Sequence, residues 1–366
     1  MPFVSVSAMD NRRHLVWQIV EGGISLSEAC RQAGVSRKTG RKWMVRAGEV
    51  GIENVAELSR APKRVPRRTD ELTERALLEL KATYPEWGAR KLVILLRRDQ
   101  GIELPSRTAD HILSRYGLTS ARPKAAPMVR FERDECGALL QMDFKGLPRG
   151  TPYALLSVLD DHGRFCLCFE PVPDKTGKSV KAALWEVFGE HGLPMSMLMD
   201  NGDCWGSPGS KVPTAFCVWL MKLGIHPIHG RPWHPQTQGK VERFHGTAKL
   251  EMGRSLVQPN IDLAKSACKS FADRYNWVRP HDSLSGATPG SRYEPFLRRR
   301  PASLPKHEVP EGTLCRLVDA EGRIYYKGRQ YKVGKGLSAE RVVLKEDEFG
   351  MRLFFMNYPL PYLFEL

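Results

Sequence analysis

Long apolar runs are missing from this sequence of 366 residues. No stretch approaches the roughly 20 consecutive apolar residues that a membrane-spanning helix needs. The first residues also lack the basic, apolar and small-residue succession of a secretory signal peptide. We therefore expect a cytoplasmic protein without a membrane partner.

Clusters of cysteine and histidine are missing as well. The eight cysteines include no CxxC pair, and none lies beside histidines at the spacing of a zinc site. The first sixty residues contain only His14 and Cys30 of these two residue types. We expect the cysteines to be reduced and no zinc to be bound.

Positive charge, in contrast, is in excess. The chain has 56 Lys and Arg against 41 Asp and Glu, which gives a formal net charge of +15. Residues 1–130 hold 24 basic and 14 acidic side chains, so they contribute most of the excess. This bias favours a polyanionic partner, contacted mainly through the N-terminal part of the chain.

Residues 1–58 carry helical periodicity. Apolar residues recur at helical spacing over 11–23, a second helix begins at Ser25 or Ser27, and a third follows with Ser36 as its N-cap. The last two helices resemble a helix-turn-helix, whose second helix enters the major groove of DNA. A solvated basic helix in a small bundle is the alternative. The DNA-contacting side chains on the third helix would be Arg37, Lys38, Arg41 and Lys42.

Gly40 is unusual inside this third helix, because glycine there costs about 1 kcal/mol relative to alanine. It either weakens the helix or lets the backbone come close to DNA.

A second helical unit is expected at 70–118, between two linkers. Residues 59–69 combine prolines with five Lys or Arg, which predicts an extended tether or an arm lying along DNA. Three helices follow, and Ser106 resembles the N-cap of the third, so that Arg107 would lie on a second DNA-recognition helix. The alternative is a three-helix bundle of unknown purpose. Residues 119–135 contain prolines and little periodicity, and we expect them to be a linker.

From about residue 136 the periodicity changes. Three short apolar strands lie within 138–172 and are followed by alternating helices and strands up to 230. This order predicts a mixed sheet with helices packed on it, within a domain at 136–300. Residues 309–366 show two β-hairpins and predict a small β-barrel that binds either DNA or protein.

Three acidic residues occupy separate elements of this predicted domain. Asp143 lies on the first strand, Asp200 ends the fourth, and Glu242 lies on a basic helix that begins within HPQTQGKVERFH. Taken singly, such residues are usually turn, cap or surface-pair residues. Together they provide the hard oxygen ligands that two-metal phosphoryl transfer requires.

Asp143, the Asp200-Asn201-Gly202 turn and the HPQTQGKVERFH run resemble the catalytic core of DDE transposases of bacterial insertion sequences, which is shared with retroviral integrases. The resemblance implies a multidomain α and α/β protein with N-terminal helix-turn-helix units and a ribonuclease-H-like core. It also implies a metal-dependent DNA endonuclease and strand transferase. Asp143, Asp200 and Glu242 would be its catalytic residues and would bind Mg²⁺, with Mn²⁺ able to substitute.

The same resemblance implies the partners. These would be double-stranded DNA, both the terminal repeats of a mobile element and its target, and further copies of the chain in a synaptic complex at the nucleoid. On the helix that carries Glu242, Lys249 suits phosphate contact, and His245 either orients the attacking group, touches DNA or is merely solvated. The DNA-contacting residues expected on this helix are Lys240, Arg243, His245 and Lys249.

One departure from the family concerns spacing. Between Asp200 and Glu242 lie 41 residues, somewhat more than is usual, and the surplus falls in the Gly- and Pro-rich stretch 204–213. Asp203 is the second choice for the second acid, and Asp161 ends a strand where the family has no ligand. Two rival functions remain: a ribonuclease-H-like nuclease that only cuts, and a DNA-binding regulator with a relic core.

Overall fold

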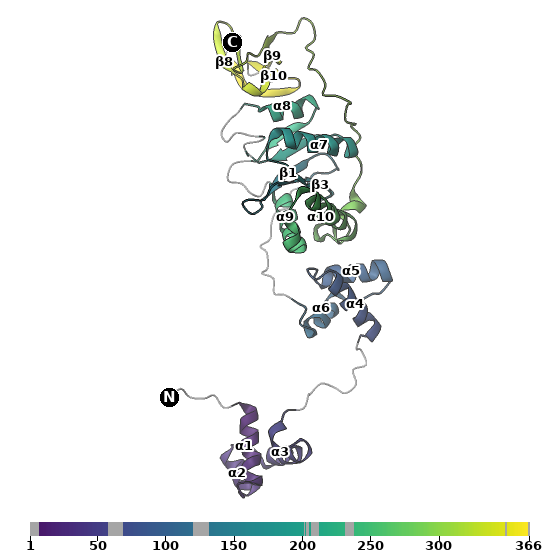
Figure 1. Cartoon of the computed structure of the whole chain (residues 1–366), viewed down its shortest axis with the longest axis vertical. Coiled ribbons are helices and arrows are strands. Elements are labelled where there is room, and N and C mark those ends of the chain that lie inside the picture. Colours follow the sequence, from purple (N-terminus) through teal and green to yellow (C-terminus); the bar gives the residue numbers. More distant parts are fainter. Residues whose placement is uncertain are drawn as a thin grey trace. The chain divides into compact units, whose positions relative to one another are not determined.

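The computed structural model describes residues 7–57, 69–119, 132–200, 202, 205, 212–230, 238–347 and 350–364 (Figure 1). The chain forms two compact units, Met1–Thr69 and Asp70–Leu366. Several predicted segments lie largely outside the described residues: nearly all of the linker at 59–69, most of the linker at 119–135, and Asp203 with most of 204–213.

The first unit contains three helices, α1 (Ala8–Val20), α2 (Leu26–Gln32) and α3 (Arg37–Val50). Ser25 and Ser36 cap α2 and α3 as predicted, each accepting a backbone N–H three residues on. Helix α1 begins earlier than its periodicity indicates, because Ser7 and Asp10 form a capping box. The core residues shared by these helices are Leu15, Val16, Ala29, Cys30, Trp43, Ala47 and Val55.

Gly40 is buried where α3 packs on α2. A Cβ at this position would lie 2.3 Å from Cys30 Sγ and 3.0 Å from Leu26 Cδ1. The glycine therefore allows the two helices to approach closely. This packing explains Gly40 without a weakened helix or a backbone contact with DNA.

Replacing Gly40 by alanine is expected to destabilise the first unit by up to about 2 kcal/mol, because overpacking costs about 1–3 kcal/mol and helix propensity returns only about 1 kcal/mol. Gly48→Ala is the matched control, since nothing lies within 4 Å of a Cβ at this exposed position in the same helix. The control should stabilise the unit slightly. Urea unfolding followed by circular dichroism measures both changes, and equal stabilities of the two variants would contradict the packing role.

The second unit begins with α4 (Glu71–Thr83), α5 (Ala89–Gln100) and α6 (Ser106–Arg115). Their shared core includes Leu77, Trp87, Leu92 and Leu113. Ser106 is the first residue of α6 and not its N-cap, because Pro105 occupies the cap position and provides no capping side chain. The three predicted helices are thus confirmed, with this correction.

The central sheet has the strand order β3-β2-β1-β4-β5. Strands β1 and β2, and β2 and β3, run antiparallel, whereas β1 and β4, and β4 and β5, run parallel. The predicted mixed sheet is therefore confirmed. The strands are β1 (Leu140–Lys145), β2 (Ala154–Asp160), β3 (Cys166–Val172), β4 (Ser196–Met199) and β5 (His226–His229).

Helices cover both faces of this sheet (Figure 1). The apolar side chains of β2 alternate between them: Leu156 and Val158 share a core with α7 (Gly177–His191) and α8 (Ala215–Lys222). Leu155 and Leu159 share the opposite core with α9 (Gly239–Met252) and α10 (Ile261–Asp273). All seven residues of β2 are buried, as expected for a strand covered on both sides.

Polar side chains join α5 and its preceding turn to the end of α9 and the segment after α10. The Trp87 indole donates to Glu251 Oε1 at 2.9 Å, and Arg279 Nε donates to the same oxygen at 2.6 Å. Lys91 Nζ lies 2.5 Å from Asp282 Oδ2. Glu251 has a side chain only 5% exposed, so this contact is part of the interior of the second unit.

The C-terminal strands form a four-stranded sheet, β11-β10-β9-β6, and a separate hairpin, β7-β8. The two predicted hairpins are present, although residues 348–349 of the second turn lie outside the described residues. Lys222 at the end of α8 pairs with Glu340 beside β9. Closure into a barrel stays a prediction. The strands are β6 (Cys315–Leu317), β7 (Arg323–Tyr326), β8 (Arg329–Lys332), β9 (Arg341–Asp347), β10 (Gly350–Phe355) and β11 (Tyr358–Phe364).

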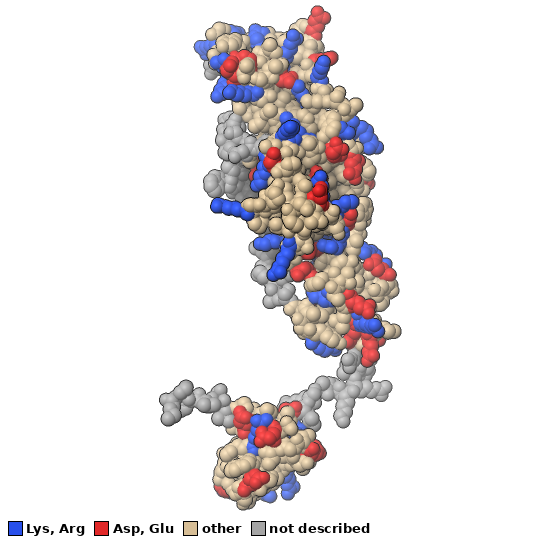
Figure 2. Space-filling model, viewed as in Figure 1, with Lys and Arg blue, Asp and Glu red and all other residues tan. Residues whose placement is uncertain are grey.

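Charged side chains of both signs are interspersed over the visible face of the second unit (Figure 2). Among the helices that the structure describes, none combines the length and apolar character needed to cross a bilayer.

Candidate active site

Asp143 and Asp200 lie at the same edge of the sheet. In the parallel pair of β1 and β4, Gln141 lies opposite Leu198. Asp143 comes two residues after Gln141, and Asp200 comes two residues after Leu198. Met197 and Met199 belong to the core beneath α7 and α8. Alternation along β4 therefore directs Leu198 toward the α9 side, and Asp200 directly follows the end of this strand.

Glu242 approaches from that side. It lies in the first turn of α9 and is exposed. Asp143 pairs across the strands with Ser157, whose hydroxyl contacts His245 of α9. Directly opposite residues share a face of the sheet, so Asp143 also faces α9.

The electrostatics of Asp143 reflect this arrangement. Burial raises its pKa to about 6, and the negative charges of Asp200 and Glu242 act in the same direction. Lys175 opposes them and lowers this pKa. The three carboxylates thus share one electrostatic environment, which a divalent cation would relieve.

In the described part of the chain, no three Asp, Glu, His or Cys side chains stand in an arrangement that would hold a metal ion as they are. Carboxylates that repel one another move apart when no cation is present. The donor set, two strand-borne acids and one acid on an adjoining helix, fits a cation that prefers oxygen ligands.

The raised pKa of Asp143 leads to a prediction about stability. Between about pH 4 and pH 6 the folded protein binds the Asp143 proton more tightly than the unfolded chain, so metal-free wild-type protein loses stability as the pH rises through this window. Asp143→Asn should therefore be more stable than wild type at pH 8, by about 1–3 kcal/mol. The gain should vanish near pH 4.

Urea unfolding of metal-free protein at both pH values measures this difference. Glu186→Gln, at an exposed glutamate of α7, is the control and should change stability by less than about 0.5 kcal/mol. A wild-type protein more stable than Asp143→Asn at pH 8 would contradict the electrostatic account.

Asp200 is held by donors from its own turn. Trp205 Nε1 donates to Asp200 Oδ1 at 2.5 Å, and the Gly202 N–H donates to the same oxygen at 2.9 Å. The Trp205 ring is buried and stacks on Phe144 of β1 at 5.0 Å. A buried aromatic side chain thus fixes the orientation of one carboxylate.

His245 does not occupy a position open to solvent. It is only 8% exposed, its Nε2 lies 2.7 Å from Ser157 Oγ, and its Nδ1 lies 3.8 Å from Asp143 Oδ2. Burial, followed by the charge of Lys145, lowers its pKa to about 4. The solvated alternative is wrong for this residue, because the face of α9 that packs on the sheet includes His245 together with Val241, Phe244 and Ala248. The DNA contact of His245 stays a prediction.

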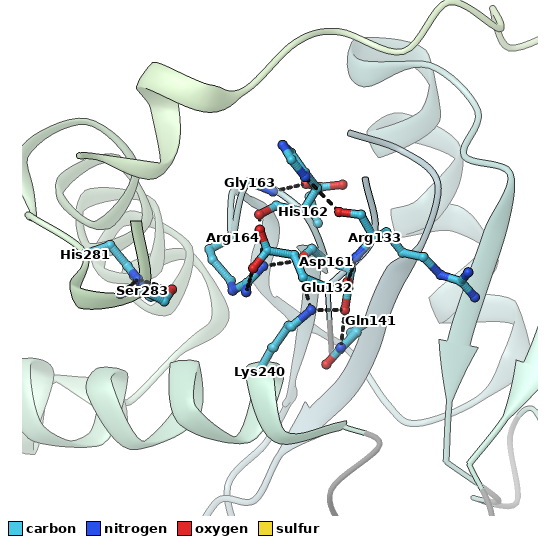
Figure 3. Close-up of polar contacts among 11 residues, drawn as sticks. Glu132, Arg133, Gln141, Asp161, His162, Gly163, Arg164, Lys240, His281 and Ser283 are labelled. Carbon is cyan, nitrogen blue, oxygen red and sulfur yellow. Dashed lines mark hydrogen bonds and ion pairs between the residues drawn. The ribbon is translucent and has the colours of Figure 1, made fainter. Parts of the chain in front are cut away.

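Lys240 also differs from its predicted role as a DNA contact. Its side chain is 17% exposed, and its Nζ lies 2.5 Å from Oδ1 of the fully buried Asp161 (Figure 3). Burial lowers the pKa of Lys240, and Asp161 opposes this shift. Asp161 is thereby excluded as a replacement for Asp200, since its carboxylate is occupied in the interior.

The other predicted DNA-contacting residues are exposed. Arg243 and Lys249 lie on α9, and Arg107 lies on α6. Lys42 forms an ion pair with Glu57, with 2.9 Å between Nζ and Oε1, and its Nζ lies over the Trp43 ring. The predicted residues on α3 that are exposed at the surface are Arg37, Lys38, Arg41 and Lys42.

Two residues that lie near the acids were not predicted from the sequence. Lys175 acts on Asp143 from the loop between β3 and α7, and Trp205 holds Asp200. The only sequence signal for Trp205 is a large aromatic residue five positions after an acid, inside a stretch otherwise rich in Gly and Pro. Nothing in the sequence around Lys175 indicates its place.

Two models of the integrase core domain match this chain, at residues 134–235 and 223–289. The matched region contains Asp143, Asp200 and Glu242. Residues 134–289 are therefore similar to an integrase core domain.

Short relatives match a small part of the chain. Protein YlbG of Escherichia coli (strain K12) is 32% identical over 78 residues, which is 21% of this chain and 63% of that protein. The uncharacterized protein YlbG of Shigella boydii serotype 4 (strain Sb227) is 31% identical over 77 residues, with the same coverage. The chain thus spans less than two thirds of the length of these relatives.

Solved structures with a similar chain include two viral integrases. The HTLV-2 integrase catalytic core domain in complex with magnesium, in its trimeric form, is 18% identical, covers 44% of this chain and 99% of its own, and has a TM-score of 0.35. The simian T-cell lymphotropic virus intasome in complex with PP2A regulatory subunit B56 gamma is 16% identical and has a TM-score of 0.38. That match covers 78% of this chain and 96% of the chain in the intasome.

Proposed function

We propose that the chain is a transposase that binds the ends of a mobile DNA element, cleaves phosphodiesters to expose 3′-hydroxyls and joins these to target DNA. The observation that carries the proposal is the approach of Asp143, Asp200 and Glu242 to one edge of the sheet inside a region similar to an integrase core domain. A non-catalytic regulator would need no such set of mutually repelling acids.

Asp143, Asp200 and Glu242 would hold the metal, with Mg²⁺ as the physiological ion and Mn²⁺ as a substitute. When bound there, such ions would supply Lewis-acid activation of an attacking oxygen and charge stabilisation of a leaving oxygen. The protein supplies the rest: Trp205 orients Asp200, and the exposed cations Arg243 and Lys249 lie on the same helix as Glu242, where they can bind phosphates. Lys175 adds a positive charge beside Asp143.

The helices of the first unit would recognise the element ends. Helices α2 and α3 have the short intervening turn and capped second helix of a helix-turn-helix, and α3 exposes four cations. Arg107 on α6 would provide a second contact. The resemblance to DDE transposases implies a multimer that brings two element ends together, so we propose that the chain acts as a homo-oligomer on double-stranded DNA.

The test is strand transfer with pre-cut ends of the DNA that flanks this gene. Wild-type protein and Mg²⁺ are expected to join the 3′-hydroxyl of these ends to a plasmid, and ends that lack the 3′-hydroxyl are expected not to react. Cleavage without joining would favour the rival nuclease. Specific DNA binding with neither reaction would favour the regulator.

A further inference from the structure

A cluster of buried polar side chains lies at the start of α9 (Figure 3). Asp161, at the end of β2, is fully buried, and Gln141 of β1 is 2% exposed. Gln141 Nε2 donates to Asp161 Oδ1 at 2.8 Å, and Lys240 Nζ lies 2.5 Å from the same oxygen. The Arg133 backbone N–H donates to Asp161 Oδ2 at 2.8 Å. Both oxygens of this carboxylate are therefore occupied by donors.

Gln141 also reaches α9 directly. Its Oε1 accepts the backbone N–H of Val241 at 3.4 Å. The first N–H groups of a helix have no partner within the helix, and they are usually satisfied by a side chain at the N-cap. The N-cap residue of α9, Gln238, provides no such bond. Within the described residues, Gln141 thus caps α9 from a neighbouring strand.

These contacts join the segments that carry two of the three acids. Gln141 is two residues before Asp143 on β1, and Lys240 and Val241 immediately precede Glu242 on α9. Asp161 holds Gln141 and Lys240 through a single oxygen, so the start of α9 cannot shift along the sheet without breaking buried charged or polar contacts. Leaving such groups unpaired in the interior is strongly unfavourable.

We propose that Gln141, Asp161 and Lys240 form a clamp that positions Glu242 opposite Asp143. They are positioning residues, since they act through Glu242 and touch neither metal nor DNA. The effect of the clamp on the metal site rests on the proposed function, whereas its effect on the start of α9 does not. Lys240 is accordingly an internal cation of the core.

Amide hydrogen exchange of the full-length protein tests the clamp without reference to activity. Lys240→Met and Gln141→Met are each expected to speed exchange of the amides at 241–245 at least tenfold. Lys222→Met is the matched control, because it removes a similarly buried pair, that of Lys222 with Glu340, whose side chains are 16% and 20% exposed. The control should leave exchange at 241–245 unchanged. Lys240→Arg retains the charge and should remain close to wild type.

Calorimetric titration with Mn²⁺ measures the consequence for the metal site. Lys240→Met and Gln141→Met should bind Mn²⁺ about tenfold more weakly than wild type, and Lys222→Met should bind it equally well. If Lys240→Met does not fold, Gln141→Met carries the test, because it removes no charge.

Exchange at 241–245 and Mn²⁺ affinity that match those of Lys222→Met in both clamp variants would overturn the proposal. Exchange that rises only in the clamp variants supports it, even if the wild-type protein performs no strand transfer. That last result would contradict the proposed function and leave the clamp standing.

Discussion

Glu242→Gln is expected to lower DNA cleavage and strand transfer by about a thousandfold or more while leaving the affinity for DNA unchanged. The amide keeps the shape of the side chain but loses the charge that binds Mg²⁺. A metal ligand contributes to a transition-state stabilisation of several kcal/mol, and each 1.4 kcal/mol corresponds to about tenfold in rate. Glu242 is exposed in the first turn of α9, so the substitution should not unfold the domain.

Single-turnover strand transfer with pre-cut ends measures this loss, and a binding assay on the same DNA provides the second reading. Glu186→Gln, at an exposed glutamate of α7 in the same domain, is the control and should react at the wild-type rate. Strand transfer by Glu242→Gln at the wild-type rate in Mg²⁺ would remove Glu242 from the proposed site.

Neutralising three cations of α3 is expected to produce the second large effect, on DNA binding. Arg37, Lys38 and Arg41 are exposed, whereas Lys42 already pairs with Glu57 and is left in place. Each phosphate contact contributes about 0.9 to the slope of log affinity against log salt, so the variant with all three changed to Gln should lose about 2.7 from this slope. Titration of the full-length protein with element ends at several salt concentrations measures it.

The matched control replaces Arg37 and Arg41 by Lys. It keeps the charge and should keep the salt dependence, but it removes the bidentate geometry with which arginine recognises bases. Discrimination between element ends and unrelated DNA should therefore fall in the control. An unchanged slope in the neutralised variant would place the DNA-binding surface elsewhere in the chain.

Local patterns in the sequence predicted the elements well. Ser36 caps α3, the three strands at the start of the core are present, and both C-terminal hairpins form. Caps, turns and alternation depend on residues a few positions apart, which a sequence displays directly. The start of α6 was misplaced by one residue because Pro105 competes with Ser106 for the cap position.

Contacts between distant segments could not be predicted in this way. Lys240 and His245 belong to a helix rich in cations, which suggested DNA contacts, yet their polar partners Asp161 and Ser157 lie 79 and 88 residues away. Gly40 depends similarly on a side chain of the preceding helix, Cys30. Periodicity indicates which face of a helix is buried, but it does not show which polar group from another segment contacts that face.

The candidate site was inferred from the family resemblance more than from the pattern of residues. Periodicity placed Asp143 and Asp200 at strand positions, but it could not show that β1 and β4 are parallel neighbours. That adjacency puts the two acids at one edge. Trp205 and Lys175, which act on these acids, carry no sequence signal of their own.

A crystal structure of the full-length protein, grown with Mn²⁺ and analysed by anomalous scattering, tests whether Asp143, Asp200 and Glu242 bind the metal. If these three acids hold the metal, anomalous peaks should lie about 2.1–2.2 Å from carboxylate oxygens of Asp143, Asp200 and Glu242, with two ions about 4 Å apart when DNA is bound. Mn²⁺ bound elsewhere, or bound without Asp143, would contradict this assignment.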